Sequence, residues 1–479
     1  MVDPKSFCRR WVDDHKDLLI ELSKKIWNYA ELGFLERKSS ALIASMLKKH
    51  GFNVKRGVAG MPTAIIATWG KGGPTIGIMG EYDALPGLSQ KTVPHKEPRE
   101  QGAPGHGCGH NIHGTSGLGG ALALKYAMEE ADLSGTIKFF GTPAEESGGG
   151  KVWMVKAGIF EGVDAVLSHH PSSMNTASLR SSNALNSVKF HFHGKSSHAG
   201  GSPEQGQSAL DAVELMNVGV NYMREHMIQD ARIHYVIEEG GNAPNIVPDY
   251  ARVWYFIRAP EREQVDELHE RVVNIAKGAT FMTGTELEVD VLEGLYNVIP
   301  NKPLSEIVLR NMREIGPPEY STEERTFGEN IAGKISTVEK REALRKSKRR
   351  DWEELMDVLL DRSIPDPWDE GEVSHGSTDV ADVSWQAPTL EFSTTAWVLG
   401  TPGHSWMNVA HAGMGIGHKS LLFAAKVIAT SAIDLLTTPD LREKAWEEFK
   451  ERTKGKEYTF PLPEGAEPPL DVNKSSLPS

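Results

Sequence analysis

The stretch Thr75-Ile-Gly-Ile-Met-Gly-Glu-Tyr-Asp83 decides the fold, because it is a short apolar run that ends in acidic side chains. Two later stretches repeat the pattern: the run 136–140 leads into Gly141-Thr-Pro-Ala-Glu-Glu146, and the run 164–168 leads into His169-His-Pro171. Apolar runs of this length, separated by helical stretches such as 115–130, are typical of buried parallel strands. The sequence therefore predicts an α/β fold with a mixed, mainly parallel sheet.

All three apolar runs end in side chains that can bind metal ions or transfer protons. In open α/β sheets, ligands bind at the edge formed by the carboxyl ends of the strands. Three strands that each deliver acids or histidines to one edge are stronger evidence than any single motif. We therefore expect the functional site at this edge.

The middle of the chain has a different pattern. The segment 188–193 alternates like a half-exposed strand, and it is followed by a predicted helix (209–227), strand (250–258), helix (261–278) and strand (287–291). This order predicts a small inserted α+β domain at 187–294. The catalytic domain would then be discontinuous, at 1–186 and 295–479. It would begin with one amphipathic helix at 11–29, and from Phe460 onward we expect a poorly ordered, Pro-rich tail.

Composition limits the classes of function. The 479 residues carry a formal net charge of −13, which argues against binding to nucleic acid or to an anionic membrane. The two cysteines, Cys8 and Cys108, are too few for a disulfide framework, and the first twenty residues lack the apolar core of a signal peptide. No stretch approaches the roughly 20 apolar residues of a membrane span, so a cytoplasmic location is expected. The basic segment 340–351 is interpreted as a solvated helix.

The stretch Gly105-His-Gly-Cys-Gly-His-Asn111 is the most informative motif. A thiolate at Cys108 and an imidazole at His110 can bind one metal ion, and the glycines allow a tight turn around it. A reactive thiol or a nucleophilic Cys/His pair are the alternatives.

Other candidates lie at the strand ends and in a late loop. Of the pair Glu145–Glu146, one can bind metal while the other takes a proton from water, although such a pair is usually only solvated. Asp83 can orient a ligand histidine. His170 is either a ligand or a core histidine, and His404 follows in Gly400-Thr-Pro-Gly-His404. Five ligand candidates exceed the needs of one catalytic ion and favour two ions. They are Cys108, His110, Glu146, His170 and His404.

Six motifs in one order resemble the metal-dependent aminoacylase and carboxypeptidase family, over about 11–435. They are Gly80-Glu-Tyr-Asp-Ala-Leu-Pro-Gly-Leu-Ser-Gln90, Gly105-His-Gly-Cys-Gly-His-Asn111, Pro143-Ala-Glu-Glu146, Ser197-His-Ala199, Ser377-Thr-Asp-Val-Ala-Asp-Val-Ser-Trp385 and Gly400-Thr-Pro-Gly-His404. The ordered set is highly specific, although each motif alone is not.

The resemblance implies two divalent ions per subunit, manganese or zinc, with Cys108 as the bridging thiolate. It implies that Glu145 is the general base, that Asp83 supports the site, and that the inserted domain is a dimerising lid. His198 in the lid would reach the partner subunit's site and stabilise the oxyanion. Asn245 and Arg258 would hold a substrate carboxylate.

The sequence departs from the family at two positions, since many relatives have His in place of Glu81 and Asp in place of Asn111. The implied reaction is metal-dependent cleavage of an N-acyl amino acid of the aminobenzoyl type, by a homodimer or together with a similar second subunit. Indole-acetyl-amino acids, dipeptides or aryl-amine deamination are alternatives. A different class, a non-catalytic partner subunit, also stays open, and the presence of Glu145 with every ligand candidate argues against it.

Overall fold

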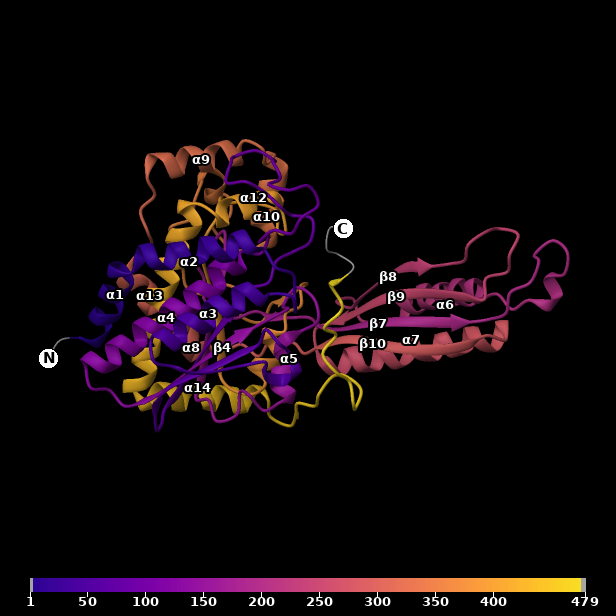
Figure 1. Cartoon of the computed structure of the whole chain (residues 1–479), viewed down its shortest axis with the longest axis horizontal. Helices are drawn as coiled ribbons and strands as arrows, with labels where there is room; N and C mark the ends of the chain where they lie inside the picture. Colours follow the sequence, from indigo (N-terminus) through magenta and orange to yellow (C-terminus); the bar gives the residue numbers. More distant parts are fainter. Residues whose placement is uncertain (1–2, 475–479) are drawn as a thin grey trace.

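The computed structural model describes residues 3–474 and has two parts, a larger body and an arm that extends from it (Figure 1). The body is built on a six-stranded sheet with the order β1-β2-β4-β3-β5-β12. The strands β3, β4, β5 and β12 are parallel, whereas β1 and β2 are antiparallel to their neighbours. The predicted mixed, mainly parallel sheet is therefore confirmed. Its strands, in sheet order, are Asn53–Arg56, Ile65–Lys71, Gly135–Thr142, Thr75–Glu81, Ala165–Ser172 and Thr389–Thr395.

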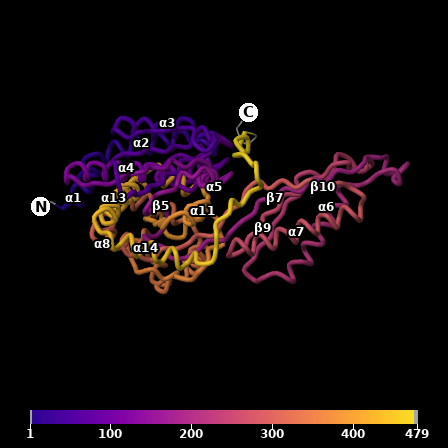
Figure 2. The backbone as a smooth tube through the Cα atoms, turned by 90° about the horizontal axis from the view of Figure 1, so that it is seen from below, coloured from indigo at the N-terminus to yellow at the C-terminus, as the bar shows by residue number. Residues whose placement is uncertain are grey.

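The central strands are apolar throughout because both faces of the sheet are covered. Ile78 and Phe139 point into the cluster formed with α4 and α13, whereas Met79 and Phe140 point into a second cluster on the opposite face. The helices of the body are α1 Pro4–Asp14, α2 Lys16–Tyr29, α3 Arg37–Lys49, α4 His110–Glu130, α5 Gly150–Lys156, α8 Lys302–Ile315, α9 Thr322–Ala332, α10 Thr337–Lys346, α11 Val380–Ser384, α12 Trp406–Ala412, α13 Gly415–Thr437 and α14 Pro439–Arg452, with short 3-10 turns η1 Val58–Gly60 and η4 Glu354–Asp357. Figure 2 shows α2, α3 and α4 along one side of the body.

Helix α4 lies unusually close to the sheet. A Cβ atom at Gly114 would lie 2.4 Å from the carbonyl oxygen of Glu81, and one at Gly117 would lie 2.3 Å from that of Met79. Glycine is required at both positions because any side chain would collide with the backbone of β3. The N-terminus of α4 is thereby held against the carboxyl end of β3.

The arm contains a second, four-stranded sheet with the order β10-β7-β9-β8, covered by two helices. It runs from 184 to 295, against the predicted boundaries 187 and 294. The strand β8 was not predicted, because it lies at the sheet edge and most of its residues are exposed. The elements are β7 Ala184–His193, η2 Pro203–Gln205, α6 Ala209–Met223, η3 Arg224–His226, β8 Arg232–Glu239, β9 Tyr250–Ala259, α7 Arg262–Thr283 and β10 Glu286–Leu295.

Three expectations about the body are wrong. The single helix predicted at 11–29 is two helices, with a break at His15 (φ −111°, ψ 16°). The helix α13 is long and apolar enough to span a membrane, against expectation, but most of it is buried in the core beside α4. In the basic segment, Arg349 is buried and pairs with Asp361, so that part is not a solvated helix.

The C-terminal segment is ordered through residue 474, which contradicts the predicted loose tail. It runs from α14 past the base of the arm (Figures 1 and 2). Phe460 packs edge-on against Trp153, with ring centroids 5.4 Å apart, and Leu462 is buried. Asn473 Nδ2 donates to the carbonyl of Gly33 at 3.0 Å and to Ser147 Oγ at 2.7 Å. The tail is therefore packed beside the loop that carries Glu145 and Glu146; residues 475–479 lie outside the described part.

Candidate metal centre

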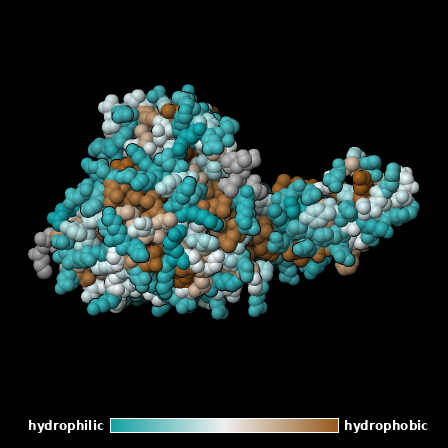
Figure 3. Space-filling view, in the orientation of Figure 1, coloured by the Kyte–Doolittle hydropathy of each residue, from teal (hydrophilic) through white to brown (hydrophobic). Residues whose placement is uncertain are grey.

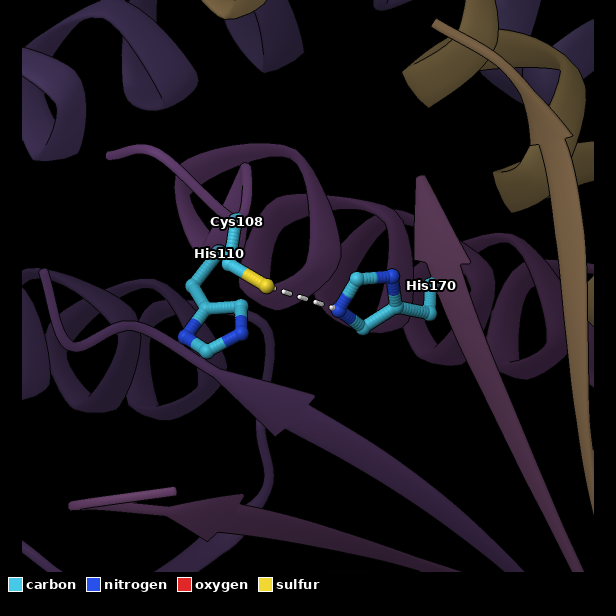
Figure 4. Close-up of side chains that lie close together, drawn as sticks. All are labelled: Cys108, His110 and His170. Carbon is cyan, nitrogen blue, oxygen red and sulfur yellow. Dashed lines mark hydrogen bonds between the residues drawn. The ribbon is translucent and has the colours of Figure 1, made fainter. Parts of the chain in front are cut away.

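The predicted ligands converge at the carboxyl edge of the sheet. Cys108 and His110 flank Gly109, whose φ of +78° is the left-handed turn that begins α4. A Cβ atom at Gly109 would lie 2.7 Å from the ring of Pro171, so only glycine fits between Cys108 and the end of β5. Local geometry therefore places the thiol of Cys108 opposite His170 (Figure 4).

The distances between the donor atoms suit metal binding. Cys108 Sγ lies 3.4 Å from His170 Nε2 and 3.6 Å from His404 Nε2. Glu146 completes the group, with Oε2 3.8 Å from His404 Nε2 and Oε1 4.0 Å from His110 Nε2. Cys108 forms one potential ligand set with His110 and His170, and another with Glu146 and His404. A bridging ligand must lie within reach of two sets of donors, and the thiol of Cys108 meets this requirement.

The hydrogen bonds of two histidines leave Nε2 free for a metal ion. His110 Nδ1 lies 2.8 Å from Asp83 Oδ1, and His170 Nδ1 lies 2.9 Å from the carbonyl oxygen of Pro171. Both acceptors require the proton on Nδ1. Nε2 of His110 is also fully buried without a hydrogen-bond partner within residues 3–474. These are the tautomers of metal-ligating histidines whose second nitrogen is oriented by a carboxylate or carbonyl.

His113 is close by but has the opposite tautomer. Its Nδ1 accepts the backbone N–H of Glu81 at 3.0 Å, which places the ring proton on Nε2. Although Glu81, His113 and Glu391 form a cluster of donor atoms, His113 is thereby a hydrogen-bond donor through Nε2, toward Ser168 Oγ at 3.1 Å. His113 does not belong to the ligand set.

Sequence reasoning missed a buried lysine behind the donors. Lys151 is fully buried, and its Nζ lies 2.6 Å from Glu81 Oε1 and 2.5 Å from Asp379 Oδ1. The other oxygen of Glu81 lies 3.2 Å from His110 Nε2. The only sequence signal was the position of this lysine directly after Ser147-Gly-Gly-Gly150, in a helix that is otherwise apolar around it. Glu81, Lys151 and Asp379 thus form a charged layer beneath the ligands.

The carboxyl groups of the site are held in unfavourable surroundings. Burial, followed by the charges of Glu81 and Glu146, raises the pKa of Glu145 well above its usual range. Burial also raises the pKa of Glu146 to about 7 and that of the Cys108 thiol further still. The buried Oε1 of Glu146 has no hydrogen-bond partner in the part of the chain that the structure describes. A divalent cation would neutralise these groups and satisfy this atom, so the residues fit the metal ions that the sequence implies.

A cavity of about 580 Å³ extends from the donor atoms to the base of the lid, which is the arm domain. Cys108, Glu145, Glu146, His170 and His404 line it, and the lid contributes Arg258. All five predicted ligands and the predicted base are therefore brought together, with Asp83 behind His110.

Two predicted lid residues lie outside this cavity. His198 and Asn245 are exposed and adjoin one another, because His198 and Ile246 form a β-bridge and Ala199 N donates to the carbonyl of Asn245 at 3.0 Å. Nδ1 of His198 accepts the N–H groups of Gly200 and Gly201 at 3.1 and 3.0 Å. Its proton therefore lies on Nε2, which leaves that nitrogen as an exposed donor.

The fold and the site are those of a hydrolase, with candidate metal ligands in the larger body and an inserted arm domain. Residues 77–335 match the model of peptidase family M20/M25/M40, and the chain belongs to this family. It is 35% identical over 476 residues to a subunit of the p-aminobenzoyl-glutamate hydrolase of Escherichia coli, covering 96% of this chain and 98% of that protein.

Other similarities agree with this assignment. The chain is 29% identical to the Xaa-Arg dipeptidase of Mus musculus, covering 92% of this chain and 90% of that protein. Its fold matches a Bacillus subtilis structure described as a dinuclear metal-binding peptidase of the M20 family, with a TM-score of 0.57 and 19% identity, covering 89% of this chain and 99% of that one. The predicted hydrolase class is confirmed.

Proposed function

We propose that the protein is a binuclear metal-dependent amidohydrolase that cleaves an N-acyl amino acid of the aminobenzoyl-glutamate type. The observation that carries the proposal is the convergence of the donor atoms of Cys108, His110, Glu146, His170 and His404, four of which line one cavity together with Glu145. The similarity over nearly the whole chain to a p-aminobenzoyl-glutamate hydrolase subunit supports the substrate type.

The ligand set suits two ions of zinc or manganese. Thiolate and imidazole ligands favour zinc, while the carboxylate of Glu146 is also suited to manganese. When bound, such ions lower the pKa of water and polarise a carbonyl oxygen. The burial that lowers the pKa of His170 and His404 keeps both rings neutral, as metal ligation requires.

Glu145 lines the cavity beside the ligands and is assigned as the general base. It takes a proton from the attacking water and delivers it to the nitrogen of the leaving amine. The raised pKa of Glu145, due first to burial, brings its proton affinity closer to that of the groups between which it transfers protons. Metal ions bound to the neighbouring donor atoms would lower the pKa of Glu145 again. Glu145 would then be a carboxylate that can accept the proton.

Arg258 lies at the lid end of the cavity and is assigned to the α-carboxylate of the substrate. Its Nη1 donates to the carbonyl of His375 at 3.4 Å, and its buried Nε has no partner within residues 3–474. A planar guanidinium binds a carboxylate through two parallel hydrogen bonds. The amide bond of a bound substrate would then lie between Arg258 and the metal ligands.

We further propose a homodimer in which His198 completes the partner's site. Its Nε2–H is exposed and free to donate to a developing oxyanion. The edge strand β8 exposes Tyr235, Val236 and Ile237, and the nearby helix α6 exposes Leu215, Val218 and Tyr222. An apolar edge strand can pair with its copy across a twofold axis. In Figure 3 the arm is mainly hydrophilic, with a hydrophobic patch near its far end.

A substrate panel tests the proposed function. The metal content of the purified protein is measured by mass spectrometry. The protein is then assayed, with zinc or with manganese, on aminobenzoyl-glutamate, an acyl-aspartate and an Xaa-Arg dipeptide. We expect two ions in each chain and fastest release of the acidic amino acid. Metal-loaded protein that hydrolyses none of the three would contradict the proposal. Because Cys108 must stay reduced to bind metal, we also propose a cytoplasmic location.

A further inference from the structure

The cavity that holds the metal donors contains a second guanidinium group that sequence reasoning did not single out. Arg180 lines this cavity together with Arg258. Arg180 belongs to the body, in the connection between β5 and β7, whereas Arg258 belongs to the lid. Neither side chain has an ion-pair partner within 4 Å among residues 3–474. Two guanidinium groups without a close ion-pair partner in the described part of the chain therefore line one cavity.

Hydrogen bonds fix the backbone on both sides of Arg180. Ser178 Oγ donates to Asp369 Oδ2 at 2.6 Å, and the N–H of Leu179 donates to Asp369 Oδ1 at 2.9 Å. Directly after Arg180, β6 (Ser181–Ser182) pairs in parallel with β11 (Val373–Ser374). The backbone of Arg180 is therefore fixed on both sides, while its exposed side chain remains free to contact a ligand.

Both arginines adjoin the two-stranded sheet or the residue that follows it. The N–H of Ser181 donates to the carbonyl of Glu372 at 2.9 Å, so the backbone of Arg180 lies beside that of Glu372. Nη1 of Arg258 donates to the carbonyl of His375 at 3.4 Å, so its guanidinium group lies beside the residue that follows β11. Both arginines therefore adjoin the stretch 372–375 and line the same cavity, where one ligand with two carboxylates can contact both guanidinium groups.

The cavity that the two arginines line also carries hydroxyl groups. Ser181, Ser374, Ser377 and Thr378 line this cavity. The buried hydroxyl of Ser377 has no hydrogen-bond partner within residues 3–474. Hydroxyl donors beside two guanidinium groups form a site for carboxylate oxygens.

One acidic residue in the same cavity could offset the positive charge of the arginines. Glu293 also lines the cavity, and burial, followed by the charge of Asp379, raises its pKa to about 7. Near neutral pH this group is therefore only partly ionised and offsets the positive charge of the guanidinium groups only in part. The cavity therefore favours an anionic ligand over a cationic one.

We propose that Arg180 is a specificity-determining residue that selects an acidic leaving amino acid by binding its side-chain carboxylate, while Arg258 binds the α-carboxylate. This proposal rests on the amide hydrolysis proposed above. It predicts that domain closure brings the two arginines onto one dicarboxylate, since they are contributed by the body and the lid.

Binding of the free amino acid tests Arg180 independently of catalysis. Isothermal titration of the metal-loaded protein with L-glutamate and with its uncharged isostere L-glutamine compares the wild type, Arg180→Gln and the control Arg325→Gln, which changes an exposed arginine on α9. We expect Arg180→Gln to weaken glutamate binding about tenfold, as loss of one charge-assisted hydrogen bond implies, and to leave glutamine binding within about twofold. Equal losses for both amino acids, no loss at all, or no glutamate binding by the wild type would overturn the proposal.

Kinetics on matched substrates give the second readout. With acyl-glutamate and acyl-glutamine, Arg180→Gln should lower kcat/KM about tenfold only for the former, through KM. A larger effect on the glutamine substrate would overturn the role of Arg180. If glutamate binds as expected but no acyl-glutamate is cleaved, the proposed hydrolysis fails while the carboxylate site stands.

Discussion

Oδ1 of Asp83 lies 2.8 Å from Nδ1 of His110, and its other oxygen accepts the backbone N–H of Glu146 at 2.9 Å. One buried carboxylate therefore orients the ring of one predicted ligand and the main chain of another. Both bonds also fix the direction in which the two ligands face each other across the site.

The change Asp83→Asn should therefore weaken metal binding without removing a ligand. The amide cannot hold the Nδ1 proton of His110 as a carboxylate does, and it cannot serve both partners in the same orientation. Loss of such a supporting group typically lowers metal affinity by about 10- to 100-fold. Competition with a chromophoric chelator measures the affinity, and circular dichroism checks the fold. Unchanged affinity in a folded variant would show that His110 does not depend on Asp83.

The change Glu145→Gln should abolish turnover but keep the metal. The amide has nearly the same shape but cannot accept a proton, and general-base catalysis contributes about 10²- to 10⁴-fold. Metal content by mass spectrometry should stay that of the wild type, because Glu145 is not one of the five predicted ligands. The matched control is Glu329→Gln, an exposed residue of α9. A Glu145→Gln protein with nearly normal kcat would assign the base elsewhere.

The change Lys151→Met should destabilise the fold strongly. It leaves Glu81 and Asp379 buried without their shared cation, and breaking a buried ion pair costs about 3–5 kcal/mol. Urea unfolding measures the loss, against Lys49→Met on the exposed face of α3, which should change stability by less than about 0.5 kcal/mol. Adding Asp379→Asn to Lys151→Met should recover part of the loss, because the two residues interact directly. Strict additivity of the two changes would contradict the buried pair.

Mixing two inactive variants tests the role of His198 in a partner's site. In a dimer of one Glu145→Ala chain and one His198→Ala chain, one of the two sites combines an intact Glu145 with an intact His198. Random reassociation of equal amounts should therefore restore about a quarter of the wild-type sites. Each variant alone, refolded in the same way, is the control. No recovery, or full activity of His198→Ala alone, would rule out a contribution from one chain to the site of the other.

The parallel strands and the ligands could be predicted because both are encoded locally. The runs that end at Asp83, Glu146 and His170 are apolar on both faces, and each is followed at once by its polar residue. Two helical layers bury those strands, so hydrophobic pattern and structure agree. Gly109 likewise indicates the turn that places the thiol of Cys108 opposite His170.

Features that depend on tertiary contacts could not be predicted in this way. Lys151 is an ordinary lysine in sequence, and only folding places it between acids from β3 and the start of α11. The tail looks disordered in sequence because its few apolar residues, such as Phe460, are far apart and gain burial only from the body. The strand β8 alternates only over its first four residues, Arg232-Ile-His-Tyr235, which is too short a pattern to identify a strand reliably.

The change Glu36→Gln should make the protein progressively more stable than the wild type as the pH rises from about 5 to 8. Glu36 is fully buried beside Asp83, its Oε1 accepts the N–H of Ala144 at 2.8 Å, and burial raises its pKa to about 8. The pKa in the unfolded chain is about 4.3, so the unfolded state loses the proton first. The folded state of the wild type is therefore penalised increasingly between these two values, whereas glutamine keeps the hydrogen bond and has no charge to bury. Urea unfolding at pH 5, 6.5 and 8 measures the difference, with Glu21→Gln, a change of an exposed residue of α2, as the control. A difference that stays constant or shrinks over this range would show that Glu36 is ionised in the fold and that the N–H of Ala144 binds a carboxylate.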